Sequence, residues 1–97
     1  MNKLHFHPSA HADLSAIRDY IAQDSKAAAR QVVEAIFRAI AQLGVFARSG
    51  RRGRAQGTYE LVLRHLPYIV VYRLLDDRVE VIAIVHMARS WLQKTIE

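Results

Sequence analysis

Hydrophobic residues alternate with polar ones at the start of the chain and then recur at helical spacing. Leu4 and Phe6 fall on one side of an extended segment and polar side chains fall on the other, which predicts a half-buried strand over residues 3–7. A proline follows, and it favours the first turn of a helix that His7 or Ser9 is placed to cap. The predicted buried stripe of this helix consists of Ala10, Leu14, Ile17 and Ile21.

A second apolar pattern at helical spacing begins after a short break. Asp24 and Ser25 end the first helix, and serine at this place is a preferred cap for the next helix. Gly44 supplies the stop at the far end. Because the break is short, we expect an antiparallel helical hairpin. The predicted buried face of the second helix contains Ala29, Val32, Val33, Ile36, Ile40 and Leu43.

Three strand-like segments follow an arginine-rich loop over residues 44–57. They span residues 59–64, 68–75 and 78–85, with a proline turn after the first segment and a two-aspartate turn after the second. The last two segments are largely apolar on both faces, so we expect them to be central strands. The order β-α-α-β-β-β predicts an α+β fold, in which the helical hairpin packs on one face of a mainly antiparallel four-stranded sheet.

Charge and residue usage narrow the possible classes of function. The chain has 97 residues with Lys+Arg 14 and Asp+Glu 9, and its formal net charge of +5 favours an acidic partner. At this length we expect one domain, residues 1–97. The absence of cysteine excludes disulfides and thiolate metal ligands. No apolar run is long enough for a signal peptide or a bilayer span, which predicts a soluble cytoplasmic protein without a membrane partner.

Histidines suggest two kinds of chemistry, and a structural interpretation is favoured for each. His5 and His7 share one face of the first strand and His11 follows a turn later, which is compatible with a metal site. An exposed, partly charged edge strand explains them better, so we expect neither a metal nor another cofactor. His86, at the end of an apolar strand, is either a general base or a buried histidine bonded to a backbone carbonyl, and the second is favoured.

Glycines and aromatic residues also have structural interpretations. Gly50, Gly53 and Gly57 are expected to permit left-handed turns, since no phosphate-binding motif follows them. Tyr72, in the middle of a strand, is predicted to belong to the core. Trp91, near the end of the chain, is expected to contact another chain or the last strand.

The order and spacing of several short segments resemble the RelE/ParE superfamily, the toxins of type II toxin–antitoxin modules. The resemblance extends over nearly the whole chain and implies a small toxin that an antitoxin encoded beside it holds inactive. The segments that carry it are residues 8–14 with Ile17 and residues 20–21, Gly50-Arg51, Gly53-Arg54, residues 57–61, residues 67–73, and residues 85–89 with Trp91.

The resemblance implies one of two activities, which differ in the residues that they need. RelE-like members cleave messenger RNA on the ribosome, using lysines and arginines to move protons and neutralise phosphate. By position, their lysine pair falls here at Glu60 and Val62 and one arginine falls at Ile69, whereas a later cation is retained as Arg89. ParE-like members lack these groups and poison DNA gyrase by binding. This chain therefore fits the ParE-like branch, with no catalytic residue, and a ribosome-dependent mRNA endonuclease is the alternative.

The partners follow from the same resemblance. It implies a hetero-oligomer with an acidic, ParD-like antitoxin, DNA gyrase as target, and no sequence-specific binding to nucleic acid. A basic nucleic-acid-binding module ranks third, since only net charge supports it. The antitoxin's amphipathic segment would occupy a groove on the second helix at Val33, Ile36, Phe37 and Ile40. The candidates for target or antitoxin contact are Arg51, Arg54, Glu60, Tyr68, Arg73, His86, Arg89 and Trp91.

The loop arginines also have a simpler interpretation, which stays open beside the first. They could be solvated charges, or they could pair with carboxylates such as Glu60 and Asp13. Glu60 is expected to anchor a nearby arginine rather than to perform catalysis.

Overall fold

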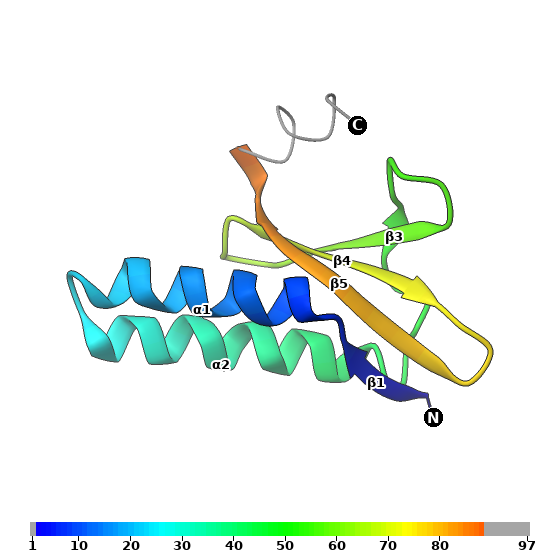
Figure 1. Cartoon of the computed structure of the whole chain (residues 1–97), viewed down its shortest axis with the longest axis horizontal. Coiled ribbons are helices and arrows are strands. Elements are labelled where there is room, and N and C mark those ends of the chain that lie inside the picture. The colour runs from blue at the N-terminus through cyan, green and yellow to red at the C-terminus, as the bar shows by residue number, and fades with distance from the viewer. Residues whose placement is uncertain (1, 89–97) are drawn as a thin grey trace.

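Two antiparallel helices cover one face of a twisted sheet and extend well beyond it at one end (Figure 1). The computed structural model describes residues 2–88. The elements are β1 (Lys3–Phe6), α1 (Pro8–Ala22), α2 (Lys26–Gln42), β2 (Arg51–Arg52), β3 (Thr58–Val62), β4 (Tyr68–Leu74) and β5 (Arg78–His86). The α+β class, the helical hairpin and the β-α-α order at the start of the chain are confirmed.

The sheet has five strands in the order β1-β5-β4-β3-β2, where the sequence predicts four. The additional strand is β2, which lies inside the predicted loop and pairs with β3 through Arg51↔Glu60 and Arg52↔Tyr59. Its sequence has neither alternation nor β-branched residues, so no local pattern marks it. The pairing β1–β5 is parallel and the other three are antiparallel, as expected for a mainly antiparallel sheet.

Both helices begin at the predicted caps. His7 Nδ1 accepts a hydrogen bond from Ser9 N–H at 3.1 Å at the start of α1, directly before the proline that opens the helix. Ser25 Oγ accepts one from Ala28 N–H at 3.0 Å at the start of α2. These bonds satisfy amide groups that have no partner within the helix.

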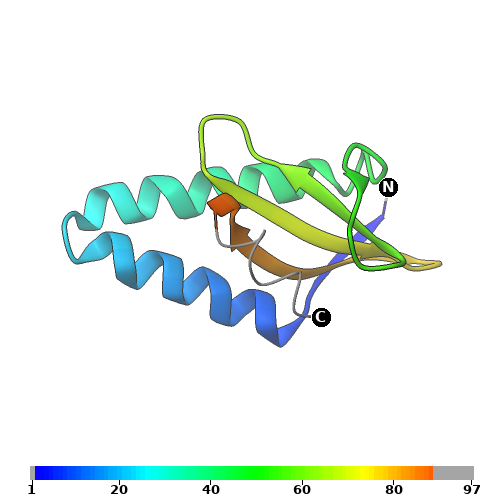
Figure 2. The same ribbon diagram turned by 90° about the horizontal axis from the view of Figure 1, so that it is seen from above.

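The core lies between the hairpin and the sheet. Its largest fully buried side chains come from α2, from the residue that caps its end and from both central strands, as the two apolar segments predict. The largest of them are Tyr72, Ile36, Ile40, Leu43, Val70, Val79 and Val81. In α1 the buried residues are Ala10 and Leu14, both in its first half, because the second half extends past the sheet (Figure 2).

Side chains of α1 replace β1 along the edge of β5. Strand β1 pairs with β5 only as far as Phe6↔Val81. Beyond this point Ser9 Oγ donates to the carbonyl oxygen of Ile82, and Ile84 N–H donates to Asp13 Oδ2 at 3.0 Å. Asp13 therefore bonds to the sheet, and the pairing with a loop arginine that the sequence allowed is absent. The α1 side chains thus satisfy backbone groups that an edge strand would leave open.

Among residues 2–88, no helix combines the length and the apolar character that crossing a bilayer requires.

Candidate functional site

The face of the sheet opposite the hairpin carries the charged residues that the sequence singles out. Side chains alternate along each strand, and Val70 and Tyr72 of β4 point into the core beneath the helices. Their neighbours Ile69, Val71 and Arg73 therefore point to the other side, here called the helix-free face, which Figure 2 views from in front. Strand register extends this face into rows: Arg51–Glu60–Val71–Ala83, Thr58–Arg73–Glu80–His5, and Val62–Ile69–Val85.

Glu60 is a buried carboxylate that holds the arginine loop. Only 5% of the residue is exposed, and Arg51 Nη2 lies 3.3 Å from its Oε1. The backbone N–H of Arg54 donates to Oε2, also at 3.3 Å. Strand β2 brings Arg51 directly opposite Glu60. The predicted contact between this carboxylate and a loop arginine is therefore present. The carboxylate of the pair is buried, whereas the Arg51 side chain is 59% exposed.

A second ion pair crosses the sheet in the neighbouring row. Arg73 of β4 donates from both Nε, at 3.2 Å, and Nη2 to Oε1 of Glu80 on β5. His5 Nε2 on β1 lies 3.8 Å from the other oxygen of Glu80. The hydrogen bond from Arg73 holds the pKa of Glu80 below its ordinary value of 4.5, although burial acts to raise it. Arg73 is thus partly committed to a structural pair within this chain.

Glu80 is absent from the predicted site, although the sequence contains a signal for it. The two-aspartate turn predicts a tight hairpin between the last two strands. Counting outward from this turn places residue 73 opposite residue 80, which is the register observed. A carboxylate and an arginine facing each other in otherwise apolar strands would have predicted the pair.

Tyr72 ties the arginine loop to the core. Its hydroxyl accepts a hydrogen bond from Gly50 N–H at 2.9 Å and donates one to the carbonyl oxygen of Ala47, also at 2.9 Å. The Tyr72 ring stacks on Tyr59 with 5.6 Å between centroids, and Arg48 Nη1 reaches the Tyr59 hydroxyl at 3.3 Å. The prediction that Tyr72 is a core residue is correct, but it missed these two bonds.

The loop glycines serve close packing more than left-handed turns. Of the glycines in residues 2–88, only Gly57 has a positive φ, of 81°. A Cβ at Gly50 would lie 2.6 Å from the Tyr72 hydroxyl oxygen and 2.8 Å from the carbonyl oxygen of Glu60. At Gly53 it would lie 2.3 Å from Thr58 Oγ1. The prediction of left-handed turns is therefore wrong for Gly50 and Gly53, where the backbone of β3 or the ring of Tyr72 leaves no room for a side chain.

The remaining candidates divide between the core, the surface and the undescribed end of the chain. Tyr68 is buried in the core, with 9% of it exposed, and its ring meets His86 edge-on at 5.5 Å. His86 is half-buried, and its Nδ1 accepts a hydrogen bond from Ala88 N–H at 3.2 Å. The structure therefore places both rings against each other and does not present Tyr68 to a partner. Arg89 and Trp91 lie outside the described residues.

The predicted groove on α2 is only partly present. Ile36 and Ile40 face the sheet and are buried at 0% and 1% exposure, so they are core residues. Phe37 is 44% exposed and packs on Phe6, with ring centroids 5.7 Å apart. Val33 lines a real hollow of about 390 Å³ at the turn end of the hairpin. Ile36 and Ile40 are therefore not accessible to a partner, because the sheet covers this part of α2, whereas Phe37 is exposed and Val33 borders the hollow.

This hollow, here called the hairpin groove, is lined by residues of both helices near the turn that joins them. At this end the two helices pass beyond the sheet (Figures 1 and 2). The lining of the groove is almost wholly apolar, and its floor includes Ala22 of α1 and Val33 of α2. Four charged residues, none of them among the predicted site residues, also line it: Arg18, Lys26, Arg30 and Glu34. Within residues 2–88, Lys26 and Arg30 take part in no ion pair.

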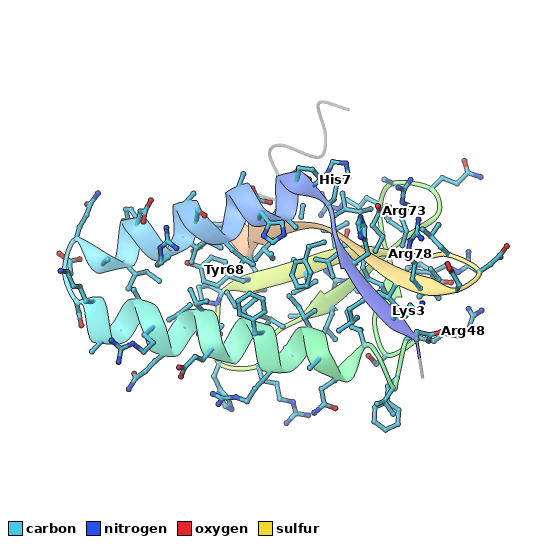
Figure 3. All side chains as sticks on the ribbon, turned by 60° about the horizontal axis from the view of Figure 1, so that its bottom comes forward. Lys3, His7, Arg48, Tyr68, Arg73 and Arg78 are labelled. Carbon is cyan, nitrogen blue, oxygen red and sulfur yellow. The ribbon has the colours of Figure 1, made fainter. Side chains whose placement is uncertain are left out.

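Basic side chains gather at the opposite end of the molecule. Lys3, Arg48, Arg73 and Arg78 lie at the end away from the hairpin turn (Figure 3). Lys3 and Arg78 are partners in the register of β1 and β5. The other loop arginines, at positions 51, 52 and 54, follow Arg48 in the chain.

Each histidine of the metal hypothesis has another role. His7 caps α1, the ring of His11 lies 5.5 Å from that of Phe6, and His5 approaches Glu80. Among residues 2–88, no three His, Cys, Asp or Glu side chains are grouped so as to hold a metal ion.

Comparison with known proteins gives consistent matches over most of the chain. A family model described as the ParE toxin of type II toxin-antitoxin system, parDE, matches residues 4–91. Y4kP of Sinorhizobium fredii is 41% identical over 80 residues, which are 82% of this chain and 82% of that protein. The toxin RelE2 of Caulobacter vibrioides is 39% identical over 78 residues, 80% of this chain and 86% of that protein.

The fold is also similar to that of a solved toxin–antitoxin structure. A chain of the chromosomal ParDE TA system from P. aeruginosa superposes with a TM-score of 0.81 at 25% identity. The similarity covers 89% of this chain and 96% of that one. The arginine loop, the helical hairpin and the described sheet all lie within residues 4–91, the range that the family model matches, apart from the first residue of β1.

Proposed function

Because the chain belongs to the ParE toxin family of type II toxin–antitoxin systems, we propose that it inhibits DNA gyrase by binding and that a cognate acidic antitoxin neutralises it. Membership of the RelE/ParE superfamily makes the chain a toxin, whereas the choice of gyrase is our inference. The proposal also places the protein in the cytoplasm, where gyrase acts.

One observation carries the choice between binding and catalysis. RelE-like toxins have a lysine pair and an arginine at three positions where this chain has other residues. These residues lie together on the helix-free face: Glu60, Val62 and Ile69. Val62 and Ile69 are direct partners across β3 and β4, and Glu60 is buried beside Arg51. Aliphatic side chains transfer no protons, and a carboxylate repels the phosphate that such a site must hold. This supports a toxin that acts by occupying a surface.

The ribosome-dependent endonuclease remains the second candidate, and one observation favours it. A relative that is 39% identical carries the name toxin RelE2. Arg51 and Arg54 also lie next to the helix-free face, where they could contact phosphate groups. The two activities differ in their products, so they can be separated directly.

The hairpin groove supports the proposed antitoxin contact. Its floor is apolar, and two rim cations, Lys26 and Arg30, have no ion-pair partner within residues 2–88. An amphipathic segment with apolar residues on one side and carboxylates on the other would match this surface. Lys26 and Arg30 therefore support an acidic partner at this surface.

The gyrase assay and the ribosome assay test the proposal side by side. Purified toxin is added to gyrase with relaxed plasmid, and separately to translating ribosomes with a defined message. We expect loss of supercoiling and an intact message. As a control, the same toxin is first mixed with the product of the adjacent reading frame, which should restore supercoiling.

Cut messenger RNA with normal supercoiling would reject gyrase as target in favour of the endonuclease. Failure of the adjacent product to bind or to protect would remove the antitoxin from the proposal, whatever the target proves to be.

A further inference from the structure

The arginine loop is held at two separate points, and one of them depends on a single hydroxyl group. Glu60 fixes the part of the loop around Arg51 and Arg54. The Tyr72 hydroxyl fixes the part before it, through Ala47 and Gly50. The loop residues are separated from Tyr72 by 25 and 22 positions in the sequence, so this tie closes a long segment of chain.

The core does not require the hydroxyl of Tyr72, because a phenylalanine ring would fill the same space. The ring is fully buried, at 0% exposure, and its packing on Tyr59 and on the helices needs only carbon atoms. Both hydrogen bonds of the hydroxyl go to loop backbone, one as donor and one as acceptor. The polar atom at this buried position is therefore explained by the loop and not by the core.

The loop is in turn shaped to meet this hydroxyl. Gly50 approaches so closely that any Cβ would collide with the Tyr72 oxygen at 2.6 Å. Strand β2 begins at the next residue, so the bond at Gly50 sets where Arg51 enters the sheet. Burial raises the pKa of the Tyr72 hydroxyl above its ordinary value of 10.0, so it stays protonated and can donate to Ala47 throughout the neutral range.

We propose that Tyr72 is a positioning residue, whose hydroxyl holds the arginine loop in the conformation that presents Arg51 and Arg54 to the toxin's target. The role of the loop in target contact rests on the proposed function, whereas the two hydrogen bonds between Tyr72 and the loop do not. A loop fixed in advance loses less conformational entropy on binding than a mobile one, so the hydroxyl should increase affinity without touching the partner.

The first test measures the loop alone in the Tyr72→Phe variant. We expect the exchange protection of the Gly50 amide to fall about tenfold, the factor that corresponds to losing one hydrogen bond of ordinary net strength. Tryptic cleavage after Arg48, Arg51, Arg52 and Arg54 should accelerate by a similar factor. Arg64, exposed in the turn between β3 and β4, provides an internal reference that should be cut at an unchanged rate.

Two further variants separate the tie from a general loss of stability. Tyr68→Phe removes the hydroxyl of another tyrosine in the same strand, whose ring packs in the core and against His86 and not against the loop, and it should leave the loop unchanged. Gly50→Ala disrupts the same contact from the other side and should reproduce the Tyr72→Phe result. Unchanged protection at Gly50 and unchanged tryptic cleavage in Tyr72→Phe would overturn the inference.

The second test measures gyrase inhibition by the folded Tyr72→Phe protein. We expect the concentration for half inhibition to rise about tenfold, with a circular dichroism spectrum like that of the wild type. A loosened loop with unchanged inhibition would overturn the positioning role. If the wild type itself does not inhibit gyrase, the proposed function and the positioning role both fall, while the exchange and proteolysis results still decide whether the hydroxyl ties the loop.

Discussion

Two carboxylates on the helix-free face, Glu60 and Glu80, show how single residues are used in this small protein. Each is buried to within a few per cent, at 5% and 8% exposure, and each is paired with an arginine that is about half exposed. A buried charge without a partner is strongly unfavourable, so the arginine is needed even where the pair adds little net stability. The main effect of both pairs is therefore to fix the position of the segments that they join, rather than to add net stability.

The Glu80 pair gives the first prediction, a dependence of stability on pH. The Arg73 hydrogen bond lowers the pKa of Glu80 in the folded state below 4.5, its value in an unfolded chain. The charged pair therefore stabilises the fold fully above pH 4.5, and its contribution is lost as the pH falls through the lower, folded-state pKa. Glu80→Gln should be less stable than the wild type at pH 7, and the difference should shrink below pH 4.5.

Urea titrations of both proteins between pH 7 and pH 3 measure this difference. Glu34→Gln, an exposed residue of α2, is the matched control and should show no such convergence. A difference that stays constant down to pH 3 would mean that Glu80 does not act through its charge.

At the scale of elements, the helical hairpin depends on how its short turn is capped. Three residues separate α1 from α2, and the third of them, Ser25, caps the second helix while its carbonyl oxygen accepts from Ala29 N–H. The hairpin extends past the sheet at this end, so tertiary packing contributes less here than at the other end. The cap should therefore contribute visibly to stability.

Ser25→Ala is predicted to lower the free energy of unfolding by about 1 kcal/mol, because the Ala28 N–H loses its acceptor. This corresponds to a fall in melting temperature of roughly 4–8 °C for a domain of this size. Thermal unfolding followed by circular dichroism measures it. Ser15→Ala, on the exposed face of α1, should leave the melting temperature within about 1 °C or raise it slightly, since alanine is the better helix former. Equal effects of the two changes would show that the cap is not important.

The sequence predicts most elements because each has a local pattern. Both helices and β4 and β5 were placed to within about one residue, since apolar periodicity and turn residues mark them. Strand β3 was placed two residues too far at its C-terminal end. Strand β2 was missed because two consecutive arginines between glycines have no strand pattern, and the pairing depends on the partner strand.

The candidate site was less predictable than the fold, for a physical reason. The Arg51–Glu60 contact follows from composition, since the loop has several arginines and Glu60 is the first carboxylate after it. The Tyr72–Gly50 contact depends on the path of the loop across the sheet, which no local pattern encodes. The hairpin groove depends on the sheet being shorter than the helices, and that is a property of the packed molecule.

At the scale of the whole molecule, the two candidate binding surfaces lie at opposite ends. The hairpin groove is at the turn between the helices, and the arginine loop is at the other end of a body that measures 40 × 32 × 24 Å (Figure 1). Under the proposed function, one surface serves the antitoxin and the other serves the target. Substitutions at one end should then leave binding at the other end unchanged.

Charge reversal at each end tests this separation. Lys26→Glu with Arg30→Glu should weaken binding of the adjacent-frame antitoxin about tenfold, the loss of two exposed charge pairs, and should leave gyrase inhibition unchanged. Arg52→Glu with Arg54→Glu, which keeps the Arg51–Glu60 pair, should abolish inhibition and leave antitoxin affinity unchanged. Calorimetric titration and a supercoiling assay provide the two measurements. Parallel losses in both assays for both variants would show that the partners share one surface.

The pairing of β1 with β5 has a consequence for the newly made protein. The first strand lies against the last one, from Lys3↔Arg78 to Phe6↔Val81, so the edge of the sheet cannot close while the ribosome still holds the later part of the chain. A nascent chain that ends before Arg78 lacks the strand that covers the core and the carboxylate that fixes Arg73. The sheet and the Arg73–Glu80 pair can therefore form only after β5 has left the ribosome, so a partner that recognises the folded sheet has nothing to bind before that point.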